Sequence, residues 1–167
     1  LREYPQNELL AHLLGYTGFL NNDELQNAKE SAEDDQVGKT GLEKYYDEYL
    51  RGENGVQADV RDSLGRAIDT RVVNLPRKGN YLETYIDGEF QEYFYRRLAS
   101  GIRSLNTRAG AVGIALDPRN GDVLALVSYP SYDNNLFVRP GNNKSRVALI
   151  NDPNKPLFNR AVSGAYN

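Results

Sequence analysis

The residues best suited to chemistry form two short strings of the kind found in serine acyltransferases. Residues 39–41 read Lys-Thr-Gly, and residues 104–106 read Ser-Leu-Asn. In one class of those enzymes, both triplets accompany a Ser-x-x-Lys motif, whose lysine helps to deprotonate the serine. None of the six lysines here has a serine three residues before it, and the Lys-Thr-Gly triplet comes first rather than last. We therefore interpret the two strings as a helix-entry turn and a helix end.

Metal, thiol and phosphate chemistry find little support in the residue types. The chain has no cysteine and a single histidine, His12, so it has no Cys/His zinc motif. Residues 117–122 resemble a calcium loop, but Arg119 occupies a ligand position and no glutamate follows at the required distance. Residues 38–40 read Gly-Lys-Thr without the upstream glycine of a phosphate-binding loop. We predict no metal and no cofactor.

Length and charge are typical of a folded protein with one or two small domains. The chain has 167 residues and a formal net charge of −3, and 40% of the residues are hydrophobic. No basic stripe alternates with aromatic residues, so nucleic-acid binding is disfavoured. No apolar run approaches the roughly 20 residues of a membrane helix. Because the first residue is Leu1 rather than Met, we expect the chain to begin inside a longer gene product.

The first third of the chain has the periodicity of helices. Leucines at positions 9, 10, 13 and 14 recur at helical spacing and stop before Gly15, a common helix end. A second, more polar helix is predicted over residues 23–32. A third is predicted over residues 41–50, where apolar side chains again share one face.

From Gly55 the pattern changes to the period of two that is typical of strands. Residues 56–60 and 67–73 flank a turn at residues 63–65, which predicts a β-hairpin. Residues 74–80 combine proline and glycine with polar residues, so we place a domain boundary there.

The second half predicts a long helix and a second hairpin. A strand is predicted at residues 81–86, and Asp87 is positioned to cap the helix. The apolar stripe of this helix consists of Phe90, Phe94, Leu98 and Ile102. Two apolar runs, 111–116 and 123–127, flank a turn with Pro and Asn-Gly, which predicts a hairpin of buried strands. Residues 129–167 predict a long ordered connection that ends in a short helix near residues 159–165.

Longer motifs span the chain almost from end to end. Arg2-Glu-Tyr4-Pro5 is followed by Gly-Tyr at 15–16, and residues 38–55 follow the pattern G-x-x-G-L-E…Y…L-x-G-x-x-G. Residues 85–91, 109–137 and 151–166 carry Y-I-D…Q, A-G-A-V…D-P…G-D-V-L-A-L-V-S-Y-P-S-Y-D and N-D-P…P-L-F-N-R-A. In order and spacing these strings resemble the class B penicillin-binding proteins, closest to the elongation-specific, cell-shape branch.

The resemblance implies an α+β fold in two parts. Residues 1–79 would form a mixed helical and β-hairpin pedestal of the dimerisation type, incomplete at its N-terminus. Residues 80–167 would supply the first helix and the first two antiparallel strands of a penicillin-recognising transpeptidase domain. The family's catalytic motifs would follow Asn167, so no catalytic residue is assigned and the chain alone is expected to be inactive. The tract from Glu24 to Gly38 is short for the family, and we expect residues to be missing there.

The resemblance also implies the activity of the parent protein, a peptidoglycan D,D-transpeptidase of cell-wall elongation. The family's serine attacks the penultimate D-alanine of a stem peptide, releases the last D-alanine and passes the acyl group to a neighbouring stem amine. Penicillins and other β-lactams trap the acyl-enzyme. The implied location is the periplasmic face of the bacterial inner membrane, through an anchor upstream of Leu1. The implied partners are a SEDS-family membrane glycan polymerase and the rod-complex scaffold protein.

Ten residues are candidates for structural or interaction roles. They are Arg2, Tyr4, Pro5, Gly38, Gly41, Glu43, Gly52, Gly55, Asn159 and Arg160. We predict a partly buried ion pair between Arg2 and Glu43, with a simple exposed glutamate at a helix start as the alternative. The four glycines are expected to serve backbone geometry. Asn159 and Arg160 would either line the approach to the catalytic serine or brace the active-site helix.

Two other interpretations of the chain stay open at this point. The piece could act as a non-catalytic interaction module, whose pedestal docks on the polymerase and the scaffold protein. It could also be an unrelated α+β binding domain. We also expect the hairpin at residues 111–127 to expose an apolar patch, because without the rest of the transpeptidase sheet its strands would leave their edges unpaired.

Overall fold

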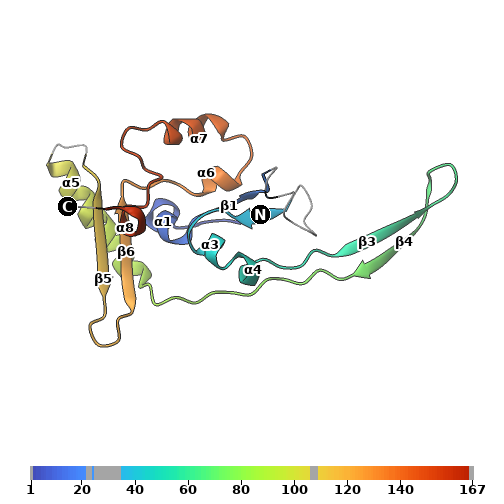
Figure 1. The fold of residues 1–167 in the computed structure, drawn as a ribbon, viewed down its shortest axis with the longest axis horizontal. Helices are drawn as coiled ribbons and strands as arrows, with labels where there is room; N and C mark the ends of the chain where they lie inside the picture. Colours follow the sequence, from blue (N-terminus) through green and yellow to red (C-terminus); the bar gives the residue numbers. More distant parts are fainter. Residues whose placement is uncertain (1, 22–23, 25–34, 106–108, 166–167) are drawn as a thin grey trace. The chain divides into compact units, whose positions relative to one another are not determined.

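The computed structural model describes residues 2–21, 24, 35–105 and 109–165, which fall into two compact units (Figure 1). The first unit combines Leu1–Tyr45 with Thr84–Asn167, and the second is Tyr46–Glu83. Helices and three antiparallel strand pairs occur among the described residues, which confirms the predicted α+β class. The predicted boundary between the pedestal and the transpeptidase domain, between residues 79 and 80, stays a prediction, because the two compact units are defined by contacts between residues and not by family motifs.

The N-terminal part of the first unit starts with a 3-10 turn and a short helix. η1 spans Asn7–Leu9 and α1 spans Ala11–Leu14, and the chain leaves α1 at Gly15, as predicted. Gly15 has φ +76°, and its N–H donates to the carbonyl of Ala11 at 2.8 Å. Such a backbone angle is easy only for glycine. Apart from Glu24, the helix predicted over residues 23–32 lies outside the described residues.

A small sheet replaces part of the predicted helical region. β1 (Thr17–Phe19) pairs antiparallel with β2 (Gln36–Gly38), and α3 (Gly41–Tyr45) follows. Strands of three residues are too short to show an alternating pattern, which explains why the sequence did not indicate them. The predicted helix over residues 41–50 is divided, because Tyr46 leaves the helical region before α4 (Asp47–Leu50) begins.

The second part of the first unit packs a long helix on a hairpin. α5 spans Gly88–Ser104 and starts at Asp87, whose side chain accepts from the N–H of Phe90 at 2.9 Å. β5 (Ala111–Leu116) pairs with β6 (Val123–Tyr129), which confirms the predicted hairpin. Within the described residues, no helix is both long and apolar enough to cross a membrane.

The buried face of α5 lies one residue away from the predicted stripe. Gln91, Tyr95 and Ala99 are the buried residues of the helix, whereas Phe94 and Leu98 are only partly buried beside them. The cluster of Tyr95, Ala99 and Val127 joins α5 to β6. The buried face is shifted by one residue because it includes Gln91, whose side-chain amide makes the buried hydrogen bonds described below.

Residues 81–86 do not form the predicted strand, because no strand of the described residues pairs with them. The expected apolar exposure on the β5–β6 hairpin is present. The side chains of Ile114 and Leu116 are 49% and 55% exposed.

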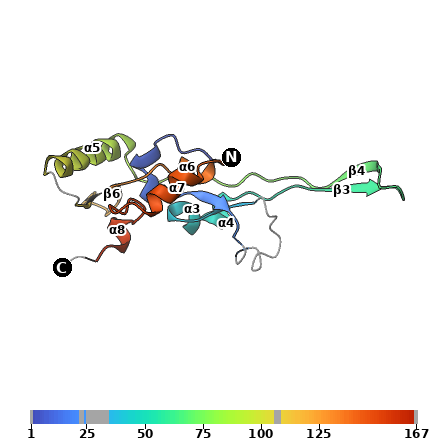
Figure 2. The same ribbon diagram turned by 90° about the horizontal axis from the view of Figure 1, so that it is seen from above.

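The segment after β6 contains more helix than the sequence indicated. α6 spans Asn135–Val138, α7 spans Asn143–Ile150 and α8 spans Arg160–Ser163. Only α8 was predicted, with wider bounds. α6 and α7 were missed because the first has only four residues and the second has no clear apolar face. Figure 2 shows α5 and α8 on opposite sides of β6.

The second unit contains α4 and the predicted hairpin of β3 (Val56–Arg61) and β4 (Ala67–Asn74). Asp62 forms the turn, since its carboxylate accepts from the N–H groups of Leu64 and Arg66, both at 2.9 Å. Every residue of both strands is exposed. Glu53, before β3, and Arg77, after β4, form an isolated antiparallel bridge. Its two N–H to carbonyl distances are 2.8 and 2.9 Å.

Candidate functional site

The predicted ion pair between Arg2 and Glu43 is present in the first unit. Arg2 Nε donates to Glu43 Oε1 at 2.7 Å, and Arg2 Nη2 donates to Oε2 at 2.9 Å. Two parallel bonds of this kind fix both side chains more firmly than a single contact. The Glu43 side chain is only 10% exposed, so the alternative of a simple exposed glutamate is wrong.

Tyr4 extends this pair into a buried network. Its hydroxyl donates to Glu43 Oε1 at 3.3 Å and accepts from the Thr17 N–H at 3.0 Å. Burial and the neighbouring Glu43 carboxylate raise the pKa of Tyr4 to about 12. The phenol therefore stays protonated and keeps its donor role at neutral pH.

Asn135, at the start of α6, binds the backbone of Tyr4 through both ends of its amide. The Tyr4 N–H donates to Asn135 Oδ1 at 3.0 Å, and Asn135 Nδ2 donates to the Tyr4 carbonyl at 2.8 Å. Both residues are buried, so these bonds satisfy backbone groups that water does not reach. They join two segments that are 131 residues apart in the sequence.

Asn134 makes a second connection between the same two segments. Its Nδ2 donates to the Gly15 carbonyl at 2.7 Å, and its side chain is fully buried. A Cβ at Gly15 would lie 1.9 Å from the Thr40 carbonyl oxygen, and one at Gly41 would lie 2.6 Å from Leu13 O. The α1 end and the α3 start therefore approach each other backbone to backbone.

His12 and a group of aromatic rings fill the space beside these bonds. The rings of His12 and Tyr132 meet edge to face at 5.2 Å, and Tyr16 stacks on Phe137 at 4.1 Å. His12 Nε2 lies 3.3 Å from the Pro130 carbonyl oxygen. Burial lowers the pKa of His12, and the charge of Arg160 acts in the same direction.

Asn159 and Arg160 connect this assembly to α8. Asn159 caps α8 by accepting from the Ala161 N–H at 3.1 Å, and its Nδ2 donates to the His12 carbonyl at 3.0 Å. The Arg160 N–H donates to Ser128 Oγ at 2.9 Å. Its guanidinium donates to the carbonyls of Asn154, Lys155 and Phe158 at 2.6 to 3.3 Å. These contacts hold α8 in place, while both predicted roles, lining the approach to a catalytic serine and bracing the active-site helix, stay predictions.

We call this assembly the polar joint. It consists of Arg2, Tyr4, His12, Gly15, Gly41, Glu43, Asn134, Asn135 and Asn159. Its members come from residues 2–4, α1 and its C-cap, α3, the start of α6 and the N-cap of α8, and they connect the N-terminal segment to the chain that follows β6. The joint connects these segments structurally, since most of its polar side-chain groups bind one another or nearby backbone; the buried Oδ1 of Asn134 has no hydrogen-bond partner among the described residues.

The remaining candidate residues lie outside the joint or beside it. Gly38 packs against α3, where a Cβ would lie 1.9 Å from the Glu43 carbonyl oxygen, and Pro5 is exposed. In the second unit, a Cβ at Gly52 would lie 2.3 Å from Arg77 O, and one at Gly55 would lie 2.8 Å from the Pro76 ring. The glycines thus permit two segments of the backbone to approach each other closely, in agreement with the predicted backbone role.

The sequence did not indicate three of the residues that hold the first unit together. Asn134 and Asn135 occur in a polar stretch where asparagine usually signals only a turn. Gln91 is 1% exposed; its Nε2 donates to the carbonyls of Leu9 and Leu126, and its Oε1 accepts from the Leu126 N–H. A buried glutamine between apolar helix positions is the one sequence signal that could have been used.

No group of three or more potential metal ligands occurs among residues 2–21, 24, 35–105 and 109–165. The Ser104 side chain donates to the Gly101 carbonyl at the end of α5, as its helix-end interpretation implies. Asn106, the last residue of that triplet, lies outside the described residues.

Comparison with known proteins decides the family. The model of the penicillin-binding protein dimerisation domain matches residues 1–84, half of the chain. This chain belongs to the penicillin-binding proteins. The resemblance drawn from its motifs is thereby confirmed, and the unrelated binding domain is wrong.

Two named peptidoglycan D,D-transpeptidases match almost the whole chain. The peptidoglycan D,D-transpeptidase MrdA of Escherichia coli K12 is 36% identical over 99% of this chain and 26% of its own length. MrdA of Acinetobacter baumannii is 38% identical over 99% of this chain and 24% of its own length. The chain therefore spans about a quarter of the length of these relatives.

Solved structures of penicillin-binding proteins share the fold. The crystal structure of Pseudomonas aeruginosa PBP2 in complex with WCK 5153 gives a TM-score of 0.70 at 33% identity, over 98% of this chain and 31% of that one. The complex between PBP2 and MreC from Helicobacter pylori gives 0.72 at 32% identity, over 95% and 28%. The likeness in fold extends over nearly the whole chain.

Proposed function

We propose that this chain is the pedestal and the first part of the transpeptidase domain of a peptidoglycan D,D-transpeptidase that acts in cell-wall elongation. The names of the MrdA relatives and their identity over the whole chain support this activity. In the proposed reaction, a serine beyond Asn167 in the whole protein attacks the penultimate D-alanine carbonyl of a stem peptide. The terminal D-alanine leaves, and the amine of a second stem peptide takes the acyl group. Penicillins would be recognised at the same serine.

The identity to the MrdA relatives over the whole chain carries the proposed activity, and the polar joint supports a second part of the proposal, the positioning of the catalytic helix. Asn159 is bonded to the His12 carbonyl, and Asn135 is bonded to the Tyr4 backbone, so the N-terminal segment holds both ends of the chain from α6 to α8. In the family, this chain leads to the helix of the catalytic serine. We propose that the joint positions that helix, because small displacements of a nucleophile cost large factors in rate.

Acylation of the full-length protein by a fluorescent penicillin tests both parts of this proposal. We expect stoichiometric labelling of the wild type and an acylation rate about tenfold lower in Asn159→Ala, which loses the bond to His12 and the cap of α8. Asn143→Ala is the matched control, because Asn143 is an exposed asparagine in the same connection. Absence of labelling would overturn the activity. Equal rates in wild type and Asn159→Ala would overturn only the positioning role.

A second function, docking on other cell-wall proteins, is favoured by the β3–β4 hairpin. All residues of both strands are exposed, including Val56, Val60, Ile68 and Val72. Exposed apolar side chains in such number are typical of an interaction surface. The Helicobacter pylori relative is solved in complex with MreC. We propose that the pedestal of this protein binds the corresponding rod-complex scaffold protein and a SEDS-family glycan polymerase, at the periplasmic face of the inner membrane.

Binding of the full-length protein to MreC of the same organism tests the docking surface. We expect Val60→Lys to weaken binding at least tenfold, since it replaces an exposed apolar side chain of the hairpin with a charged one. Gln57→Lys adds the same charge at an exposed polar position of the same strand and should change binding less. If both variants bind like the wild type, the hairpin is not the contact surface.

A further inference from the structure

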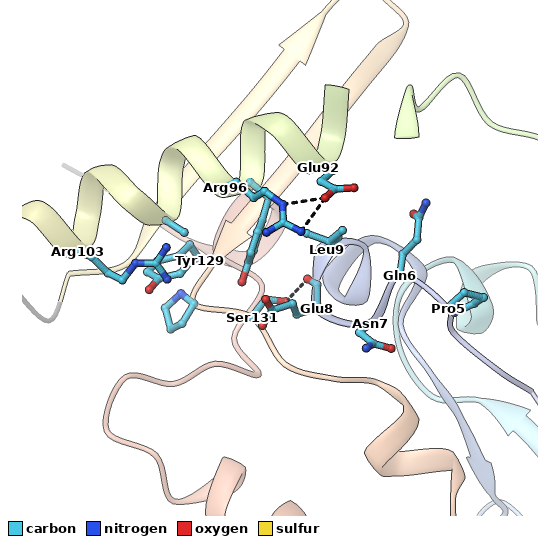
Figure 3. Close-up of a pocket in the computed structure, with 13 residues that line it drawn as sticks. Pro5, Gln6, Asn7, Glu8, Leu9, Glu92, Arg96, Arg103, Tyr129 and Ser131 are labelled. Carbon is cyan, nitrogen blue, oxygen red and sulfur yellow. Dashed lines mark hydrogen bonds and ion pairs between the residues drawn. The ribbon is translucent and has the colours of Figure 1, made fainter. Parts of the chain in front are cut away.

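A cavity of about 560 Å³ in the first unit has no role in the polar joint. Residues 5–9 form one wall, α5 forms the other, and residues 129–131 close the cavity between them (Figure 3). This volume lies in the range of sites for small ligands and short peptides.

Several bonds hold the walls of the cavity in place. Gln91 Nε2 donates to the Leu9 carbonyl at 2.7 Å and so ties the first wall to α5. Ser131 Oγ donates to the Glu8 carbonyl at 2.8 Å. Tyr95 and Ala99 are almost fully buried, and the ring of Tyr95 meets that of Tyr129 edge to face at 6.1 Å. The cavity is therefore largely preformed, which lowers the entropic cost of binding.

The charged residues of the cavity differ in whether they are already paired. Arg96 forms an ion pair with Glu92 at 2.7 Å, drawn as dashed lines in Figure 3. Among the described residues, the side chains of Arg103 and Glu8 form neither an ion pair nor a hydrogen bond. Both act on the buried Tyr95 phenol, because burial and Glu8 raise the pKa of Tyr95 while Arg103 lowers it. One available cation and one available anion thus lie near the same phenol.

We propose that this cavity binds a short peptide that carries both a free carboxylate and a free amino group. Arg103 receives the carboxylate, for which a planar guanidinium is well suited, and Glu8 receives the amino group. The partly exposed ring of Tyr129, supported from behind by Tyr95, packs against the aliphatic part of the peptide. The stem peptide of the proposed function has this chemistry, so the assignment of the ligand rests on that function. The cavity would be a second, non-catalytic site for the same substrate class.

Titration of the full-length protein with an N-terminally acetylated, lysine-containing pentapeptide that ends in D-Ala-D-Ala tests the proposal, because the lysine amine is then its single free amino group. The catalytic serine is first blocked with penicillin, so that calorimetry reports only binding elsewhere. We expect binding to the blocked wild type, and affinities at least fivefold lower for Arg103→Gln and for Glu8→Gln. Arg97→Gln is the matched control, because Arg97 lies on α5 and does not line the cavity. It should bind like the wild type.

Modified peptides distinguish the two charged contacts. A pentapeptide with an acetylated lysine amine should bind Glu8→Gln and the wild type equally, and a C-terminal amide should bind Arg103→Gln and the wild type equally. Lack of binding to the blocked wild type, or equal loss in Arg97→Gln, would overturn the proposal. Failure of penicillin to label the protein would instead overturn the proposed function, so the two failures are distinguishable.

Discussion

The polar joint and the β3–β4 hairpin use similar residue types in opposite surroundings. In the joint, Glu43, Tyr4 and Asn135 are buried, and several of their bonds reach distant partners: Tyr4 and Glu43 are 39 residues apart, and Asn135 and Tyr4 are 131 residues apart. In the hairpin every strand residue is exposed, and polar contacts such as that of Thr70 with Asp59 link near neighbours. A buried polar group without its partner costs far more than an exposed one. We therefore expect substitutions in the joint to affect the whole first unit and those in the hairpin to remain local.

The largest difference should come from two glycines with nearly the same backbone angle. Gly15 has φ +76° and Gly65, at the hairpin turn, has φ +78°. A Cβ at Gly15 would lie 1.9 Å from Thr40 O, whereas none of the described atoms lies within 4 Å of one at Gly65. We expect Gly15→Ala to cost more than about 3 kcal/mol of unfolding free energy and Gly65→Ala about 1 kcal/mol. Urea denaturation of both variants measures the difference, and similar costs would contradict the close backbone approach at Gly15.

A second test compares two side-chain hydrogen bonds. Asn135→Ala leaves the N–H and carbonyl of Tyr4 buried without partners, so we expect a loss of about 2–3 kcal/mol. Thr70→Ala removes an exposed bond to Asp59 at 3.1 Å and should cost less than about 0.5 kcal/mol. Denaturation midpoints give both values. A small loss of stability in Asn135→Ala would mean that water takes over the hydrogen bonds of the Asn135 amide to the Tyr4 backbone.

The third test compares ion pairs. Glu43→Ala removes the carboxylate that binds Arg2 and Tyr4, and we expect a loss of about 2 kcal/mol. Asp69→Ala breaks the exposed pair with Arg71 in the hairpin and should cost no more than about 0.5 kcal/mol. Added salt should reduce the loss in Asp69→Ala by a larger fraction than the loss in Glu43→Ala, because a partly buried pair is screened less than an exposed one. Equal losses of unfolding free energy in the two variants would show that burial does not make the Arg2–Glu43 pair more stabilising than the exposed Asp69–Arg71 pair.

The smallest effect should appear as a dependence of stability on pH. Burial lowers the pKa of His12 in the folded chain from its ordinary 6.5. Below that value the unfolded chain binds more protons, so the contribution of His12 is full above pH 6.5 and falls as the pH decreases. The slope cannot exceed about 1.4 kcal/mol per pH unit for one proton. Thermal unfolding between pH 7.5 and 5.5 should show the loss in the wild type and a flatter profile in His12→Gln. If the stability of the wild type and of His12→Gln changed equally with pH, His12 would not be the source of the pH dependence.

Local signals in the sequence were enough to predict those helices and strands that have a clear capping residue, turn or hydrophobic period. Asp87 as the cap of α5, the turn at residues 63–65 and the end of α1 at Gly15 are all present. The strand predicted at residues 81–86 is absent, since strand residues need a partner that the local sequence does not reveal. The short pair β1–β2 and the helices α6 and α7 were missed for the same kind of reason.

By itself, the sequence determined the α+β class, the family and the pairing of Arg2 with Glu43, because motif order and local periodicity are properties of the chain alone. The tertiary structure decided which polar residues matter for the joint. Asn134, Asn135 and Gln91 look like ordinary turn or helix residues until the segments before and after them come together. Their importance arises from burial beside backbone groups that have no other partner, and burial depends on contacts between segments as many as 131 residues apart.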